Sequence, residues 1–177
     1  ATCTYDSIFF RLNIYKVNGK RDFENILIKP IYINLQKNQV ADKISINSII
    51  FKNPNIINES SKRFGSQAIT VSIDVKKINN EYECYYNLGK TKSFRKLKDF
   101  LIECVDRGAG EIVINSIEHD GLMKGYDNEL IKYTSSLVNV PVVASGGAGN
   151  YDHFYEAYKN GADAFAASSI YHFTEHT

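Results

Sequence analysis

The sequence predicts an α/β fold built on a mostly parallel sheet. Three apolar segments in its second half, at 110–117, 140–147 and 162–169, each read as a strand that ends in small or polar residues. Helical patterns separate these segments, and the connecting loops of about two to six residues leave no obvious domain boundary. Strands that alternate with helices in this way pair in parallel, so we expect a single domain over residues 1–177.

The first strand-helix units follow residue 41. A strand at 41–47 precedes a helix that begins at Pro54 and stops at Gly65, because proline suits the first helical turn and glycine suits a helix end. The next segment, 68–74, is β-branched and nearly continuous in apolar character. It therefore predicts a strand buried on both faces, which we expect to end at Asp74.

An insertion and a long helix come next. The polar segment 76–92 contains an alternating stretch of tyrosines and predicts a β-hairpin. Ser93 is expected to cap a helix that closes at Gly108. Its apolar residues recur at helical spacing and are Leu97, Phe100, Leu101, Cys104 and Val105. The strand at 110–117 follows directly.

Two further helices complete the alternation. Asp127 is expected to cap the helix before the strand at 140–145, and Asn150 or Asp152 the helix before the strand at 162–169. In this last helix we expect Phe154, Ala157 and Tyr158 to face inward. Five strand-helix units leave two architectures open, a doubly wound sheet and a closed eight-stranded barrel. No Gly-x-Gly-x-x-Gly follows the first strand, which counts against a dinucleotide-binding fold.

Composition excludes several function classes. The chain has 177 residues, of which 44% are hydrophobic and 23% charged, with a net charge of +1, so no basic field favours nucleic acid. It has no apolar run long enough to cross a membrane and no signal-peptide pattern, so we expect a cytoplasmic protein. Cys3, Cys84 and Cys104 are scattered, which disfavours a disulfide framework and a zinc site, and Cys104 is expected in the core. We expect no cofactor and no metal.

The strand ends predict one shared site. The carboxyl ends of parallel strands open on the same face of a sheet, so Ser145, Gly146 and Gly147 should lie near Ser168 and Ser169. Glycines at such a position leave backbone N–H groups exposed to an anion, and two neighbouring strand ends of this kind predict a phosphate site. The alternative is that the glycine pair only makes a tight strand-to-helix turn.

Six collinear motifs resemble the cyclase subunit of imidazole glycerol phosphate synthase. They are Ala-Asp-Lys-Ile-Ser-Ile-Asn-Ser at 41–48, Phe-Gly-Ser-Gln-Ala-Ile-Thr-Val-Ser-Ile-Asp-Val-Lys at 64–76, Arg-Gly-Ala-Gly-Glu-Ile-Val-Ile-Asn-Ser-Ile-Glu-His-Asp-Gly at 107–121, Gly-Tyr-Asp at 125–127, Ala-Ser-Gly-Gly-Ala-Gly at 144–149 and Gly-Ala-Asp-Ala at 161–164. The resemblance covers residues 41 to 173, roughly three quarters of the chain.

This resemblance implies a (β/α)₈ barrel that works with a glutaminase subunit. Ammonia from the glutaminase passes through such a barrel, where the cyclase, a lyase, converts the phosphorylated nucleotide PRFAR into imidazole glycerol phosphate and AICAR. Asp74 matches the strand-end carboxylate that acts as a general acid or base, a role that burial can favour by moving a pKa toward neutrality. Without the resemblance, Asp74 would be interpreted as a turn or capping residue.

The resemblance also assigns binding residues. Asn47 and Ser48 match one phosphate site, and Gly121, Gly146, Gly147 and Ser169 match the other. Asp120 matches an aspartate near the ribulosyl part of the substrate. Asp42, Lys43 and Gln67 match the amino-terminal face, where the glutaminase docks, although Asp42 and Lys43 could equally form a solvated strand entrance.

The chain departs from the family pattern in its first 40 residues. A complete barrel needs about 250 residues, and the first-strand run that carries a second catalytic aspartate is not found, Asp6 being a poor candidate. The segment 7–14 resembles the second strand, and 30–34 stands where the third is expected. The last helix is missing after Thr177. The expected fold is therefore an incomplete barrel.

A second group of relatives gives an alternative function. The segment 115–127 is closer to paralogues associated with surface polysaccharides, because Asn115 and Glu118 stand where the histidine enzymes usually have Thr and Asp. In those paralogues the barrel is thought to serve sugar amidation, again with a glutaminase. The alternative is therefore a weakened or non-catalytic scaffold that binds a glutaminase and conducts ammonia.

Overall fold

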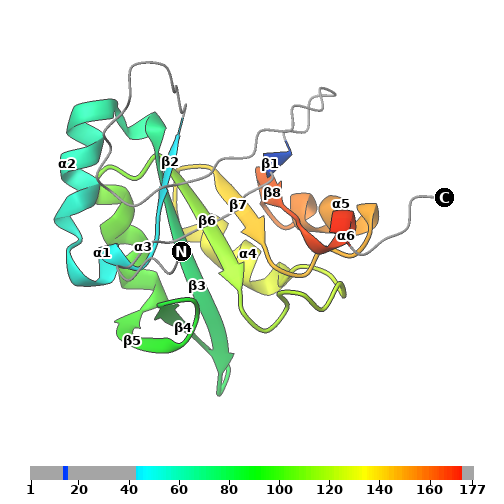
Figure 1. The fold of residues 1–177 in the computed structure, drawn as a ribbon. Helices are drawn as coiled ribbons and strands as arrows, with labels where there is room; N and C mark the ends of the chain where they lie inside the picture. Colours follow the sequence, from blue (N-terminus) through cyan, green and yellow to red (C-terminus); the bar gives the residue numbers. More distant parts are fainter. Residues whose placement is uncertain (1–13, 16–42, 173–177) are drawn as a thin grey trace, which may run out of the picture.

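The computed structural model describes residues 14–15 and 43–172 (Figure 1). In chain order the elements are β1 (Ile14–Tyr15), β2 (Ile44–Ile46), α1 (Ile49–Lys52), α2 (Asn55–Phe64), the 3₁₀ turn η1 (Ser66–Ala68), β3 (Ile69–Ile78), β4 (Glu81–Tyr86), β5 (Thr91–Lys96), α3 (Leu97–Asp106), β6 (Glu111–Ser116), α4 (Asn128–Leu137), β7 (Val142–Ser145), α5 (Tyr151–Lys159), β8 (Ala164–Ala166) and α6 (Ser169–His172). The expected strand at 30–34 lies outside these residues, as does the one at 7–14 apart from Ile14.

The elements form one sheet with a parallel centre. β2, β3, β6, β7 and β8 pair in parallel in that order. The hairpin of β4 and β5 extends β3 antiparallel, and β1 pairs antiparallel with β8. Within the described residues the sheet stays open, which confirms the α/β prediction and the expectation of an incomplete barrel.

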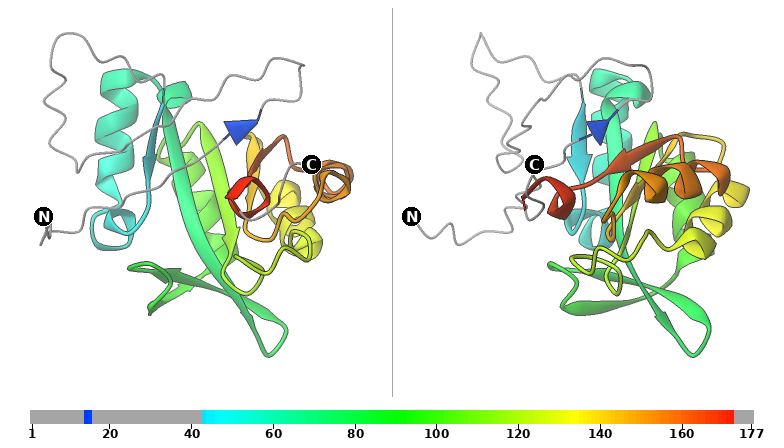
Figure 2. Two further views of the ribbon diagram at one scale, coloured as in Figure 1. Left: turned by 45° about the vertical axis from the view of Figure 1, so that its right-hand side comes forward. Right: turned by 90° about the vertical axis from the view of Figure 1, so that its right-hand side faces the viewer.

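The helices α2 to α5 pack on one face of this sheet (Figures 1 and 2). Successive side chains of a strand point to opposite faces, so β3 presents Val71, Ile73 and Val75, all fully buried, to the helix layer. The alternate residues Ser72 and Asp74 point to the other face. The apolar core therefore lies between sheet and helices, while the second face is free to carry polar groups.

The hairpin after Asp74 corrects one expectation. β3 does not end at Asp74 but continues to Ile78, because β4 folds back and pairs with its last residues. The connecting loop is Asn79 and Asn80, with φ of 51° and 65°. Two left-handed residues between antiparallel strands are typical of a type I′ turn, and asparagine tolerates this conformation.

The expected helix caps had mixed outcomes. Asp127 and Asn150 cap α4 and α5, since their side chains accept hydrogen bonds from Leu130 N and His153 N. Ser93 is not a cap, because β5 continues to Lys96, which precedes α3 without any side-chain cap.

Burial also bears on residues named from the sequence. Cys104 is fully buried, as predicted, and burial raises the pKa of its thiol to about 12. Ala157 is buried as expected, but Tyr158 is 61% exposed and does not face inward.

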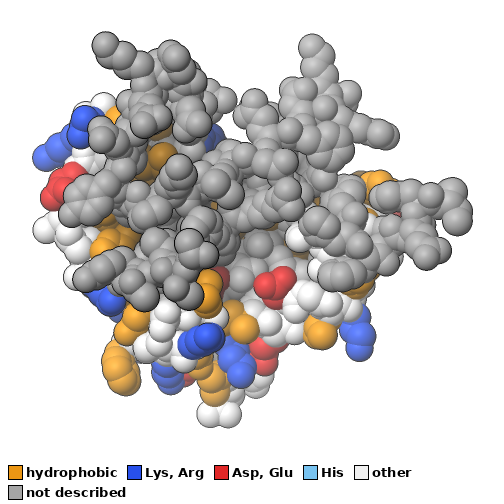
Figure 3. Space-filling view, in the orientation of Figure 1, with side chains coloured by type: hydrophobic (Ala, Val, Ile, Leu, Met, Phe, Trp, Pro, Cys, Tyr) orange, Lys and Arg blue, Asp and Glu red, His pale blue; other side chains and the backbone are white. Residues whose placement is uncertain are grey.

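Figure 3 shows the charged and hydrophobic side chains on the part of one face that is not drawn in grey. Lys and Arg side chains are interspersed with hydrophobic ones over the end of the molecule that carries the hairpin. Among the helices in the described ranges, none has both the length and the apolar character that crossing a membrane requires.

Candidate active site

The strand registers place four residues in one row across the sheet. Asp74 of β3 stands beside Asn115 of β6, Asn115 beside Ser145 of β7, and Ser145 beside Ala166 of β8. These residues lie at or near the carboxyl ends of β6, β7 and β8, as the sequence predicted. The row therefore joins a carboxylate, an amide and a hydroxyl at one edge of the sheet.

Asp74 is buried, and both of its carboxylate oxygens accept hydrogen bonds. Asn115 Nδ2 donates to Oδ1 at 3.0 Å, and Asn47 Nδ2 donates to Oδ2 at 3.3 Å. Burial raises the pKa of the Asp74 carboxyl above its usual range, while the bonds from Asn115 and Asn47 act against the rise and the charge of Asp120 adds to it. The arrangement gives a fixed carboxylate that binds a proton more strongly than an exposed aspartate does.

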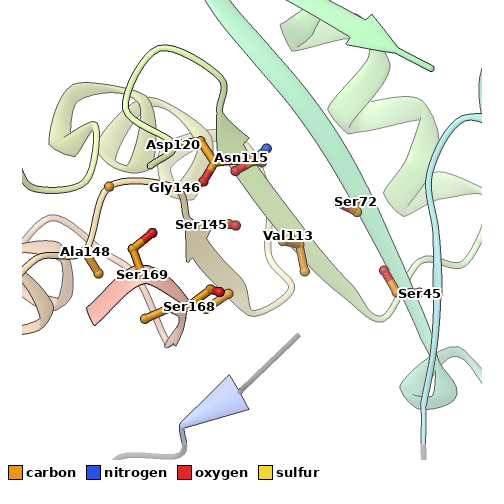
Figure 4. Close-up of a pocket in the computed structure, with 13 residues that line it drawn as sticks. Ser45, Ser72, Val113, Asn115, Asp120, Ser145, Gly146, Ala148, Ser168 and Ser169 are labelled. Carbon is orange, nitrogen blue, oxygen red and sulfur yellow. The ribbon is translucent and has the colours of Figure 1, made fainter. Parts of the chain in front are cut away.

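A cavity of about 230 Å³ lies next to this row. In Figure 4 the side chains of Ser145, Ser168, Ser169 and Asp120 stand around one part of it, and Ser72 and Ser45 lie on its far side. Its lining residues are Ser45, Ser72, Val113, Asn115, Asp120, Ser145, Gly146, Gly147, Ala148, Ala166, Ala167, Ser168 and Ser169. Most of the predicted strand-end residues thus share one cavity. Asp74 is not among the lining residues, but it accepts a hydrogen bond from Asn115, which lines the cavity.

The glycine pair has a structural role, which agrees with the tight turn that the sequence left open as an alternative. Gly146 and Gly147 have φ of 85° and 112°. A Cβ on Gly146 would lie 2.7 Å from Ser116 O, and a Cβ on Gly147 would lie 2.1 Å from Gly125 O. Both positions therefore require glycine because of neighbouring protein backbone. The contact of these glycines with an anion, expected from the sequence, remains a prediction beside this structural role.

The loop between β6 and α4 carries Asp120 and is held at several points. Ser116 Oγ lies 2.8 Å from His119 Nδ1, and the backbone N–H groups of His119 and Asp120 both donate to Ser116 O. Lys77 N donates to Glu118 Oε2 at 3.0 Å, which ties this loop to β3. These contacts fix Asp120 beside the cavity.

Gly121 is separate from the cavity. It has a φ of 77°, and a Cβ added there would meet nothing within 4 Å. It does not line the cavity, so the sequence assignment of Gly121 to a phosphate contact remains a prediction.

Asn47 and Ser48 lie at the carboxyl end of β2 and are buried. Asn47 contacts Asp74, and Ser48 Oγ donates to Asn47 Oδ1 at 3.3 Å. Ser48 Oγ also accepts a hydrogen bond of 2.8 Å from Asn87 N, in the turn between β4 and β5. Neither residue lines the cavity, so the two predicted phosphate sites lie on separate parts of this edge.

The opposite edge of the sheet holds two of the predicted partner residues, Lys43 and Gln67. Lys43, just before β2, forms an ion pair with Glu111 at the start of β6, and Thr70 Oγ1 donates to Glu111 Oε1 at 2.8 Å. Gln67 is exposed in η1, before β3. Lys43 is therefore more than a solvated strand entrance, because its charge compensates a buried glutamate.

Two aspartates named from the sequence, Asp6 and Asp42, lie outside the described residues. In the described part of the chain, no group of three or more His, Cys, Asp or Glu side chains could hold a metal ion.

Asn115 is the site residue that sequence reasoning did not select. It contacts Asp74 directly and lines the cavity. Its position in the strand at 110–117 was visible in the sequence, but its partner depends on the register between β3 and β6, which no local pattern determines. The sequence did show that Asp74 ends one expected strand and that Asn115 lies near the end of another.

Comparisons with known proteins agree with the resemblance. A family model described as Histidine biosynthesis protein matches residues 33–177. The imidazole glycerol phosphate synthase subunit HisF of Chloroherpeton thalassium is 46% identical over 138 residues, which cover 77% of this chain and 55% of the relative. The HisF subunit of Flavobacterium johnsoniae is 44% identical over 144 residues, covering 81% of this chain and 57% of the relative.

A third relative, the HisF subunit of a Thermotoga species, is 44% identical over 135 residues, covering 76% of this chain and 53% of the relative. The chain thus spans about half the length of the curated relatives it matches. The family model covers most of the chain, and its family folds as (β/α)₈ barrels. The open, mostly parallel sheet is consistent with part of that barrel, and the chain belongs to the histidine biosynthesis protein family.

Proposed function

We propose that this chain carries the cyclase site of an imidazole glycerol phosphate synthase, which uses ammonia to convert PRFAR into imidazole glycerol phosphate and AICAR. The observation that carries the proposal is the buried carboxylate of Asp74, fixed by two amides beside a cavity of serines and glycines. The similarity to HisF subunits supports it independently.

Asp74 is proposed as the general acid and base. Attack by ammonia and closure of a ring both require protons to leave nitrogen and reach a leaving group. A carboxyl whose pKa is raised by burial can accept a proton and return it in the same cycle. The amides of Asn115 and Asn47 hold both oxygens, so the proton-transferring oxygen keeps its direction.

The cavity is proposed to hold one phosphate of the substrate. Ser145, Ser168 and Ser169 can donate hydroxyl hydrogen bonds, and the loop at Gly146 and Gly147 brings backbone close to them. Asp120 would contact the sugar hydroxyls, since a carboxylate facing a phosphate would be repelled. Asn47 and Ser48 remain the proposed contacts of the second phosphate.

A glutaminase is the proposed partner. The similar proteins are named as subunits of a synthase, which supports a partner chain. Gln67 is exposed at the amino-terminal edge of the sheet, away from Asp74 at the carboxyl edge. We expect docking at this edge, because ammonia would then enter at the end opposite to the reaction.

The test is ammonia-dependent turnover of the purified full chain. With ammonium salt as the nitrogen source, release of AICAR from PRFAR is measured for the chain, for Asp74→Asn and for Asp106→Asn. Asp74→Asn should reduce turnover by about 10² or more, since general acid-base groups contribute factors of this size. Asp106, exposed at the end of α3, is the matched control and should leave turnover unchanged.

Two outcomes would contradict the proposal. Near-normal turnover of Asp74→Asn would remove Asp74 from the chemistry. Absence of turnover in the unaltered chain, combined with retained binding of a glutaminase, would instead support the non-catalytic scaffold.

A further inference from the structure

We propose that the turn between β4 and β5 positions the Asp74 carboxylate through a chain of hydrogen bonds that passes through Ser48 and Asn47. Asn87 N in the turn donates to Ser48 Oγ at 2.8 Å, and Ser48 Oγ donates to Asn47 Oδ1 at 3.3 Å. Asn47 Nδ2 then donates to Asp74 Oδ2 at 3.3 Å. In this proposal, Ser48 and the turn orient Asn47, and Asn47 in turn holds the Asp74 carboxylate in place.

The chemistry of the groups fixes the direction of this chain. An ionised carboxylate only accepts hydrogen bonds, so Asn47 must present its NH₂ group to Asp74 and its carbonyl oxygen to Ser48. Ser48 must then donate its hydroxyl proton, which leaves an oxygen lone pair for Asn87 N. If the turn withdrew, Ser48 could rotate, and Asn47 would lose the contact that selects its amide orientation. Each link therefore depends on the one before it.

Burial increases the energetic importance of these hydrogen bonds. Asn47, Ser48 and Asp74 are 2%, 7% and 4% exposed, so water is largely excluded as a substitute partner. Hydrogen bonds among such groups are costly to leave unmade, which favours the complete chain over any partial one.

The backbone conformation of the turn directs the N–H group of Asn87 toward Ser48. Asn87, Leu88 and Gly89 have φ of 56°, 58° and 71°, and Lys90 N donates to Asn87 O at 3.2 Å. Leu88 is 66% exposed, so the tip itself is not held by a core. The base of the turn is held separately, because Tyr86 stacks on Phe51 of α1 with ring centroids 5.3 Å apart.

The test uses two measurements on the full chain without substrate. Titration of the Asp74 carboxyl is followed by carbon NMR, and hydrogen exchange of the Asn87 amide is followed in the same samples. Ser48→Ala should raise the pKa of Asp74, because Asn47 is no longer oriented. It should also accelerate Asn87 exchange by about fivefold, because one hydrogen bond is lost. Ser48→Thr, which keeps the hydroxyl, should restore both values.

Matched variants separate coupling from general damage. Ser93→Ala removes another buried hydroxyl of the same hairpin, whose contact is Arg95 N, and should change neither measurement. Asn87→Ala strains the exposed turn without altering Ser48 and should raise the pKa of Asp74 in the same direction, which keeps the test available if Ser48→Ala does not fold. All variants retain Asp120, whose charge also acts on Asp74.

The proposal is overturned if Ser48→Ala accelerates Asn87 exchange while the Asp74 titration stays unchanged. It is also overturned if Asn87→Ala leaves the pKa of Asp74 where it was. The inference rests on the proposed function only where it gives Asp74 a proton-transfer role. Both measurements are made without turnover, so a failure of the cyclase activity and a failure of the coupling are separate results.

Discussion

Replacing Gly147 by alanine should destabilise the protein much more than replacing Gly121. Both glycines have a positive φ, 112° and 77°, so alanine is strained at either position by about 1–2 kcal/mol. They differ in their surroundings. A Cβ on Gly147 would lie 2.1 Å from Gly125 O, whereas a Cβ on Gly121 would meet nothing within 4 Å.

The additional cost at Gly147 follows from these contacts. Gly125 O is backbone and cannot rotate away, so the loop must move, at about 1–3 kcal/mol for overpacking. This movement also disturbs the 2.8 Å hydrogen bond from Gly125 N to Gly147 O, which contributes about 1 kcal/mol. We expect Gly147→Ala to lower the free energy of unfolding by about 3–6 kcal/mol and Gly121→Ala by about 1–2 kcal/mol.

The assay is urea unfolding followed by circular dichroism for both variants and the unaltered chain. The comparison between the two alanines cancels the backbone strain that they share and leaves the steric contribution. If Gly147→Ala were no more destabilised than Gly121→Ala, the close approach of Gly125 would not hold, and the glycine pair would again be interpreted mainly as a ligand contact.

Three further predictions concern Asp74, Lys43 and Gln67. Burial raises the pKa of Asp74, so ionisation of this carboxyl opposes folding. As the pH rises from about 3.8 through the raised pKa, the free energy of unfolding of the unaltered chain should fall relative to that of Asp74→Asn. Parallel curves of unfolding free energy against pH for the two proteins would contradict this. Lys43→Met should lower the free energy of unfolding by about 1–2 kcal/mol, because buried Glu111 then keeps only its hydrogen bond from Thr70. Gln67→Ala should lower it by less than about 0.5 kcal/mol. The same Gln67 variant should weaken glutaminase binding, as measured by calorimetry. Equal stability of these two variants would show that the Lys43 charge is not needed by Glu111.

The strands and helices were predictable where local chemistry decides them. The apolar period of α3 and the caps Asp127 and Asn150 depend on residues within a few positions of each other. Ser93 was misassigned because the pairing of β5 with β4 continues to Lys96, opposite Glu83, and this long-range pairing overrides the preference of serine for a cap.

The candidate site was predictable only in part, for a related reason. Strand ends can be recognised from sequence, so the shared location of Ser145, Ser168 and Ser169 was within reach. The contact of Asn115 with Asp74 depends on register, and the need for glycine at 147 depends on a loop that is more than twenty residues away in the chain. Neither can be derived from a local pattern.

The turn at Asn79 and Asn80 affects more than the tip of a hairpin. A two-residue turn of this kind sets which residues of β4 face which residues of β3, and here it places Tyr85 opposite Asp74. One inserted residue would shift the pairing and turn each β4 side chain beyond it to the opposite face of the sheet. Two exposed asparagines outside the cavity thus determine the neighbours of the buried carboxylate. A change in hairpin length would therefore alter the surroundings of Asp74 while every residue of the site is kept.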